Sequence, residues 1–221
     1  MGDASAVVGT ASTDRDARFV FEIGELLRLD TADDELLFQV AERLGRYLGV
    51  SRVLFLEVDA GGQHTRVRRD YRDGLPSLTG VTPVESFSPE TVRKARAGEI
   101  VVRDDTRSDG EYAVAYTRAG IEARVAVPLR KQGRWVATLL VTHHEARAWE
   151  KREITLIQLV AERAWRWYEQ LEAVQALRTS ERRFRALTEA SAQVVWSLSA
   201  NGAVREDSSS WRAFTGRSRE D

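Results

Sequence analysis

The sequence predicts an α+β protein in which an antiparallel sheet is flanked by helices and followed by one long C-terminal helix. Two amphipathic helical patterns open the chain, and alternating apolar runs separated by turn residues fill its middle. A helical pattern then runs from about residue 150 to about residue 190. With 221 residues, 43% of them hydrophobic and 30% charged, the chain can form one large or two small domains.

The composition excludes several kinds of site. No cysteine is present, so the chain can form no disulfide, thiolate metal site, cysteine nucleophile or thioether-linked chromophore. Three histidines leave little for a metal site, and we expect no metal. The formal net charge of -1 argues against a nucleic-acid partner, and no apolar run reaches the ~20 residues of a membrane span. We therefore expect a cytoplasmic protein.

The N-terminal part carries the two amphipathic helices. Residues 1–13 are small and polar, and we expect a disordered lead there. The first helix is predicted to begin at about Asp14, because apolar residues follow at three- and four-residue steps up to Leu27. Thr31 is the expected cap of the second helix, which Gly49 ends.

The middle of the chain alternates strands with short helices. The run 52–59 is apolar on both faces, as in a central strand, whereas the run 64–71 carries arginines on one face, as in a protected edge. An irregular stretch, 73–87, precedes Ser88-Pro89-Glu90, which is typical of a helix start. The remaining predicted elements are a helix ending at Gly98, a strand at 100–103, a helix at 111–119, strands at 123–130 and 134–143 with a tight turn between them, and a hairpin after Val194.

Four motifs, taken in order, resemble a GAF domain between Asp14 and about Leu171. They are Tyr71-Arg-Asp-Gly74, Gly98-Glu-Ile-Val-Val-Arg-Asp-Asp105, Ala126-Val-Pro-Leu129 followed by Gly133-Arg-Trp-Val, and Trp149 before Ile154. We therefore expect a GAF sensory domain over residues 14–149 and a connecting and dimerisation helix over residues 150–190.

The C-terminal part is similar to the opening of a PAS domain. The motifs are Glu181-Arg-Arg-Phe-Arg-Ala-Leu187, Val195-Trp196, Asn201-Gly202 and Trp211 to Gly216, so residues 191–221 would be the N-terminal fragment of a PAS domain. The order GAF, helix, PAS resembles the sensory region of bacterial sensor histidine kinases. It implies a non-catalytic sensory and dimerising region within a two-component signalling protein. The alternatives are the sensory region of a diguanylate cyclase or phosphodiesterase, and a structural dimerisation module without ligand.

Six residues are candidates for a ligand pocket, because the resemblance places several of them in the segments that cover the pocket of GAF domains. Aromatic rings and one arginine together suit a planar or anionic ligand, although the same rings could complete a small core. The candidates are Tyr71, Phe87, Tyr112, Tyr116, Arg118 and His143.

We expect no cofactor and no catalytic residues. GAF domains that carry a bilin attach it through cysteine or hold it with a distinctive acidic motif, and this sequence has neither. The cyclic-nucleotide signature of phosphodiesterase GAF domains is missing too. A non-covalent small ligand stays open. No Ser/His/Asp set, paired carboxylates or phosphate-binding glycine loop is evident in the sequence.

The long helix is predicted to form a parallel homodimer. Apolar residues follow steps of three and four, as in a coiled-coil seam: Ile157, Val160, Ala164, Trp167, Leu171 and Val174. Apolar residues then resume out of phase at Leu177, Phe184 and Leu187, so that two packings would compete in one helix. The alternative is that the first face packs on the sheet and the first helix of its own chain.

Overall fold

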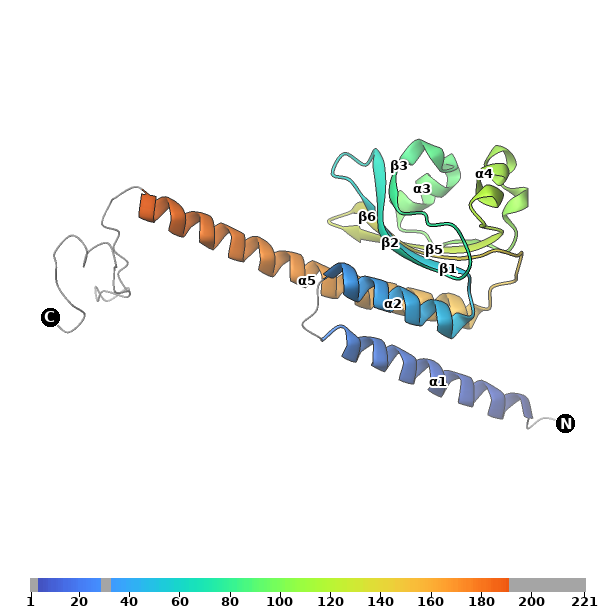
Figure 1. Ribbon diagram of the computed structural model, residues 1–221. Helices are drawn as coiled ribbons and strands as arrows, with labels where there is room; N and C mark the ends of the chain where they lie inside the picture. Colours follow the sequence, from blue (N-terminus) through green and yellow to red (C-terminus); the bar gives the residue numbers. More distant parts are fainter. Residues whose placement is uncertain (1–3, 29–32, 191–221) are drawn as a thin grey trace, which may run out of the picture. The chain divides into compact units, whose positions relative to one another are not determined.

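An antiparallel sheet carries the fold, and helices cover both of its faces (Figure 1). The computed structural model describes residues 4–28 and 33–190. The strands in this part are β1 (Arg52–Val58), β2 (His64–Arg72), β3 (Gly80–Pro83), β4 (Val101–Arg103), β5 (Ala123–Lys131) and β6 (Arg134–His143). They lie in the order β3-β2-β1-β6-β5-β4, and every neighbouring pair is antiparallel. The predicted fold class is confirmed.

One face of the sheet is covered by α2 (Asp33–Leu48) and the first part of α5 (Lys151–Ala190), and α1 (Ala4–Leu26) packs on the outer side of these two helices (Figure 1). The main core lies here, and Ile23 of α1, Leu36 of α2 and Ile157 of α5 are fully buried in it. Burying one such side chain stabilises the fold by ~1.5–3 kcal/mol. This face therefore holds most of the apolar stability of the domain.

The opposite face is covered by shorter elements and has a much smaller core. These elements are η1 (Val84–Ser86), α3 (Pro89–Ala97), η2 (Thr106–Ser108), η3 (Gly110–Tyr112) and α4 (Ala113–Arg118). We call residues 84–98 and 104–119 the lid. Beneath it Leu54, Leu56 and Val67 form the small core, with Phe87 and Trp135 packed against them.

Local sequence signals account for the boundaries of these elements. Ser88 caps α3 by accepting a hydrogen bond from the backbone N–H of Thr91, and Gly98 ends the helix in the left-handed conformation at φ 81°. Positive φ angles at Gln132 (50°) and Gly133 (78°) give the β5–β6 turn the twist that a two-residue hairpin loop requires.

Three features differ from the sequence prediction. The helix α1 begins at Ala4, so residues 4–13 of the expected disordered lead are helical; this segment contains three alanines and no proline, which favours a helix. The stretch 73–87 contains the strand β3, which the sequence did not suggest because Gly80 and Pro83 are poor strand formers. Since β3 pairs with β2, the arginine-bearing strand β2 lies inside the sheet, and the edge strands are β3 and β4.

The chain divides into two compact units, 1–168 and 169–221, so the boundary falls inside α5. The first unit contains the sheet, the lid and the helices that pack on them. The predicted cap Thr31 and the predicted PAS fragment, 191–221, lie outside the described residues. None of the helices described is both long and apolar enough to cross a membrane.

Candidate ligand site

A small cavity lies between the sheet and α3, under the lid. Its volume is about 40 Å³, and its walls are apolar except for one charged side chain and two threonines. The residues that line it are Leu56, Phe87, Thr91, Val92, Ala95, Val101, Arg124, Ala126, Pro128, Trp135, Thr138 and Leu140. A pocket of this kind, apolar with few polar groups, is typical of small-molecule sites, although such sites are usually larger.

Arg124 is the charged residue of the cavity wall and is only 4% exposed. One terminal nitrogen of its guanidinium donates to Asp109 Oδ2 (2.9 Å) and Thr91 Oγ1 (3.1 Å). The guanidinium also lies over the ring of Tyr116, 4.2 Å from its centroid. Within the described residues, Nε of Arg124 and the hydroxyl of Tyr116 are buried and have no hydrogen-bond partner.

Further charges surround Asp109 at the base of the lid. Arg103 donates from Nε to Asp109 (3.0 Å) and from a terminal nitrogen to Glu90 (2.8 Å), and Lys94 also pairs with Glu90 (2.9 Å). The hydrogen bonds from Lys94 and Arg103 lower the pKa of Glu90 to about 2. Asp109 thus joins Arg124 of the cavity wall to Arg103 of β4.

A buried ion pair anchors the other end of the lid. Arg52 and Asp70 have no exposed side-chain surface, and Arg52 Nε lies 3.8 Å from Asp70 Oδ2. The guanidinium of Arg52 also donates to the carbonyls of Ala119 (2.8 Å) and Pro76 (2.7 Å), so it ties the end of α4 to the loop before β3. Burial lowers the pKa of Arg52 below the usual arginine range.

The segment between β6 and α5 is hydrogen-bonded to the base of the lid. Trp149 donates from its indole Nε1 to the carbonyl of Arg103 (3.2 Å) and from its backbone to Asp104 Oδ1 (3.1 Å). Arg147 donates from its backbone to the carbonyl of Asp104 (2.9 Å), and its guanidinium binds Glu153 in the first turn of α5 (2.5 Å). Arg103 therefore contacts lid carboxylates with its side chain and, with its carbonyl, Trp149 in the segment that leads into α5.

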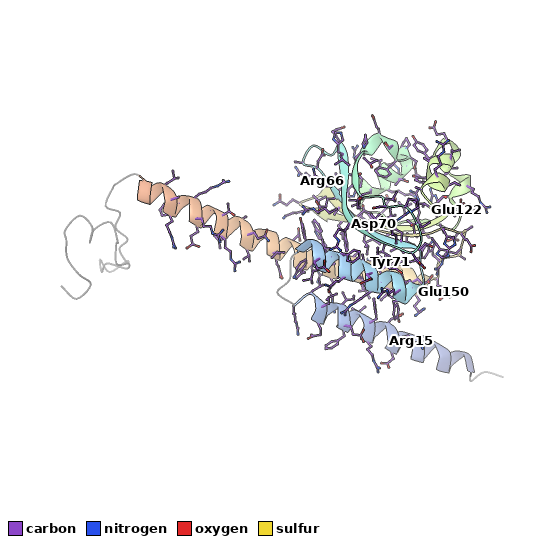
Figure 2. All side chains as sticks on the ribbon, viewed as in Figure 1. Arg15, Arg66, Asp70, Tyr71, Glu122 and Glu150 are labelled. Carbon is purple, nitrogen blue, oxygen red and sulfur yellow. The ribbon has the colours of Figure 1, made fainter. Side chains whose placement is uncertain are left out.

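The six predicted pocket residues do not lie together. Phe87 lines the cavity, and Tyr116 contacts the cavity residue Arg124. Tyr112 lies in a surface hollow beside α3, and Arg118 is exposed. Tyr71 packs against the main core on the other face of the sheet, because it follows Asp70 on β2 and successive strand residues point to opposite faces (Figure 2).

The sixth residue, His143, also lies away from the cavity. Its Nδ1 contacts Ser51 Oγ (3.0 Å), and Nδ1 of His144 contacts the same oxygen (2.5 Å). Burial, followed by the charge of His144, lowers the pKa of His143. His143 thus belongs to a polar cluster at the start of β1, where it helps to join β1 to the end of β6.

Sequence reasoning missed Arg124, which the structure places in the cavity wall. A signal existed, because Arg124 is the one charged residue in the otherwise apolar run 123–129. A charge in a buried strand needs a partner, and burial of this kind marks positions of structural or functional use. No group of three or more His, Asp or Glu side chains that could hold a metal occurs among the described residues.

The first half of the predicted dimer seam lies in the core of its own chain. Ile157, Val160 and Ala164 are each 0% exposed in the main core, and Trp167 packs against the same cluster. Ile157, Val160 and Ala164 are therefore not available for a partner, in agreement with the alternative that this face packs within its own chain. Later residues of α5 are exposed: Val174 (45%), Leu177 (70%), Phe184 (67%) and Leu187 (71%).

The model of the GAF domain family matches residues 34–166, which is more than half of the chain. The chain therefore belongs to the GAF domain family, as the motifs predicted. The matched range extends past the expected boundary at 149, because the first turns of α5 complete the core. No curated protein sequence matches the chain.

Several solved structures resemble the chain in fold. The phycocyanobilin-bound GAF domain of a cyanobacterial phytochrome has a TM-score of 0.60 and 17% identity, over 67% of this chain and 91% of that one. A phycoerythrobilin-bound GAF domain, also from a cyanobacterial phytochrome, has a TM-score of 0.65 and 16% identity, over 72% and 97%. The chromophore-binding domain of a bacteriophytochrome from R. palustris has a TM-score of 0.63 and 15% identity, over 73% and 62%.

These similarities correct one expectation. We expected no cofactor from the lack of cysteine and of known ligand motifs, but the similar structures include GAF domains with bound bilins. The fold therefore does not support the expectation that the chain binds no cofactor. The lack of cysteine bears only on the covalent attachment of a bilin. At 15–17% identity the similarity shows the fold alone.

Proposed function

We propose that the chain is the sensory and dimerisation region of a bacterial sensor histidine kinase, in which a small ligand under the lid changes the state of α5. The family and the likeness to phytochrome sensory domains support a sensory signalling role. The observation that carries the proposal is the continuous set of hydrogen bonds from the cavity wall to the start of α5. The PAS-like motifs after residue 190 support the kinase context.

The bilin of the similar structures is the first ligand to test against this site. A drug-sized ligand needs a pocket of ~300–1,000 Å³. The cavity measures only about 40 Å³, and no cysteine is present to attach a chromophore. The cavity as it stands is too small for a bilin, and the sensory mechanism below does not depend on one.

Signal transfer follows from the contacts at Asp109. A change at Arg124 alters the ion pair with Asp109, which also binds Arg103. The carbonyl of Arg103 accepts a hydrogen bond from the indole N–H of Trp149, so a shift of β4 moves a residue two positions before α5. Packed and hydrogen-bonded elements of this kind can couple two sites when the element between them has two arrangements.

The dimer is proposed through the part of α5 that follows the core. Leu177 and Phe184 are seven residues apart, and Leu187 follows three residues later, which is the spacing of a coiled-coil seam. Leu177 and Leu187 are about 70% exposed, and a second copy of the same helix would bury both. The seam therefore starts later on α5 than the sequence pattern alone suggested.

The experiment for this proposal weakens the lid contacts and measures backbone hydrogen exchange around the start of α5. Asp109→Asn should accelerate backbone hydrogen exchange by about tenfold in residues 147–157 as well as in α3, because it removes the carboxylate between Arg124 and Arg103. The matched control is Asp105→Asn in the same loop, since Asp105 pairs with the exposed Arg107 instead. In the full-length protein, Asp109→Asn should also change the rate of histidine autophosphorylation with ATP.

Two results would count against the proposal. Exchange that rises in α3 but stays at the wild-type rate in residues 147–157 would show that the lid is not coupled to α5. A full-length protein that forms no acid-labile phosphate with ATP would rule out the histidine-kinase assignment.

A further inference from the structure

The wall of the cavity under the lid contains one buried cation, and one of its N–H donors makes no hydrogen bond. Arg124 is 4% exposed and lines the cavity, and its Nε–H has no partner within the described residues. A buried guanidinium N–H without an acceptor costs free energy, so the site favours any small molecule that brings an acceptor to it. We propose that the cavity binds a short-chain carboxylate of the size of acetate, with its carboxylate on Arg124 and its alkyl end against the apolar wall.

The dimensions of the cavity set the size of the ligand. At about 40 Å³ the cavity is far smaller than the ~300–1,000 Å³ of sites for drug-sized ligands, so it suits a ligand of only a few non-hydrogen atoms. Acetate, with its methyl group and its carboxylate, is of this size. The apolar part of the cavity wall, which includes Ala126, Val92 and Leu140, would accept the methyl group.

The charges around the cavity favour an anion. Three cations (Lys94, Arg103 and Arg124) share two carboxylates (Glu90 and Asp109), so the cluster carries one positive charge in excess. A guanidinium also binds a carboxylate with shorter and stronger hydrogen bonds than it forms with a neutral acceptor. A carboxylate at Nε would thus compete with Asp109 for Arg124.

This inference rests on the proposed sensory function, because it names the ligand class of the same cavity. It also gives the signal a physical origin. A ligand carboxylate that binds Arg124 partly neutralises its charge, so the Arg124–Asp109 ion pair weakens. Asp109 then turns toward Arg103, whose carbonyl is hydrogen-bonded to Trp149.

The test is a titration of the whole chain with sodium acetate, followed by NMR at the Nε–H of Arg124 and the indole N–H of Trp135. Sodium chloride at equal concentration controls for ionic strength. A ligand of four non-hydrogen atoms binds with a Kd of about 0.04 mM at the tightest, and we expect a Kd of about 1 mM. Acetamide, which has the same shape but no charge, should bind at least ~10-fold more weakly.

Three variants locate the site. Arg124→Gln removes the guanidinium, and Ala126→Leu fills the cavity while keeping the ion pair of Arg124 with Asp109; each should weaken acetate binding at least ~10-fold. Arg118→Gln is the matched control, because Arg118 is an exposed arginine of the lid, and it should bind acetate as the wild type does. Thermal unfolding shows which variants stay folded, and Ala126→Leu still tests the site if Arg124→Gln does not fold.

The outcomes separate this inference from the proposed function. No saturable shift of Arg124 Nε–H up to 50 mM acetate, or equal binding by Ala126→Leu, would overturn the carboxylate site, while the coupling of the lid to α5 would stand. Acetamide binding as tightly as acetate would also overturn it and leave a neutral ligand in the cavity. Phycocyanobilin that displaces bound acetate from the wild type would overturn the size limit.

Discussion

Neutralising Asp70 should destabilise the domain strongly, because Asp70 is the anionic partner of the fully buried Arg52. Arg52 Nε and Asp70 Oδ2 are 3.8 Å apart, and neither side chain is exposed. At an effective dielectric constant of ~20, unit charges at this distance attract each other by about 4 kcal/mol. Removing one member of a buried pair typically costs ~3–5 kcal/mol, since the other charge stays buried without compensation. We expect Asp70→Asn to lower the free energy of unfolding by about 3–4 kcal/mol.

Urea unfolding at pH 7, followed by tryptophan fluorescence, measures this loss. Glu99→Gln is the control, because Glu99 pairs with Arg93 at 3.5 Å on the surface, and both side chains are more than half exposed. Exposed pairs of this kind contribute ~0–1 kcal/mol, so the control should stay close to the wild type.

A double-mutant cycle with Arg52→Met separates the ion pair from the other contacts. Asp70 also pairs with Arg72, which donates to its Oδ1 (3.0 Å), and accepts hydrogen bonds from Ser77 Oγ (2.8 Å) and the backbone of Leu78 (2.9 Å). With Arg52 replaced, Asp70→Asn should cost less than it does in the wild type, because the remaining cation, Arg72, is half-exposed, and the coupling between the two changes should be about 2–3 kcal/mol. A loss below 1 kcal/mol for Asp70→Asn, or additive effects in the cycle, would refute the view that Asp70 compensates Arg52.

Two further predictions concern His143 and the dimer. Burial lowers the pKa of His143, so the unfolded chain binds a proton below pH 6.5 before the folded chain does. Stability is therefore full above this pH and falls below it, and His143→Gln should flatten the decrease between pH 6.5 and 5 in thermal unfolding. An unchanged slope in His143→Gln would contradict this. Leu177→Glu should weaken dimerisation at least ~10-fold in sedimentation, whereas Gln175→Glu on the same exposed helix should not; a wild type that is monomeric at high micromolar concentration would contradict the seam.

Local patterns predicted most of the elements because the determining interactions are short-range. The cap Ser88, the stop Gly98 and the β5–β6 turn lie within a few residues of the atoms that they bond or orient. The strand β3 was missed for the same reason, since Gly80 and Pro83 have little strand preference of their own. Its pairing with β2 comes from a neighbour strand rather than from its own composition.

The sequence by itself determined the α+β class, the GAF family and the helical character of residues 151–190. Only the tertiary structure decided which face of α5 is used, because Ile157 and Val160 repeat at a spacing that fits both a dimer seam and a core. Tertiary structure also decided the site. Arg124 of β5 contacts Tyr116 of the lid, whereas Tyr71 and His143 lie elsewhere. Such contacts depend on how distant segments pack rather than on the spacing of residues along the chain.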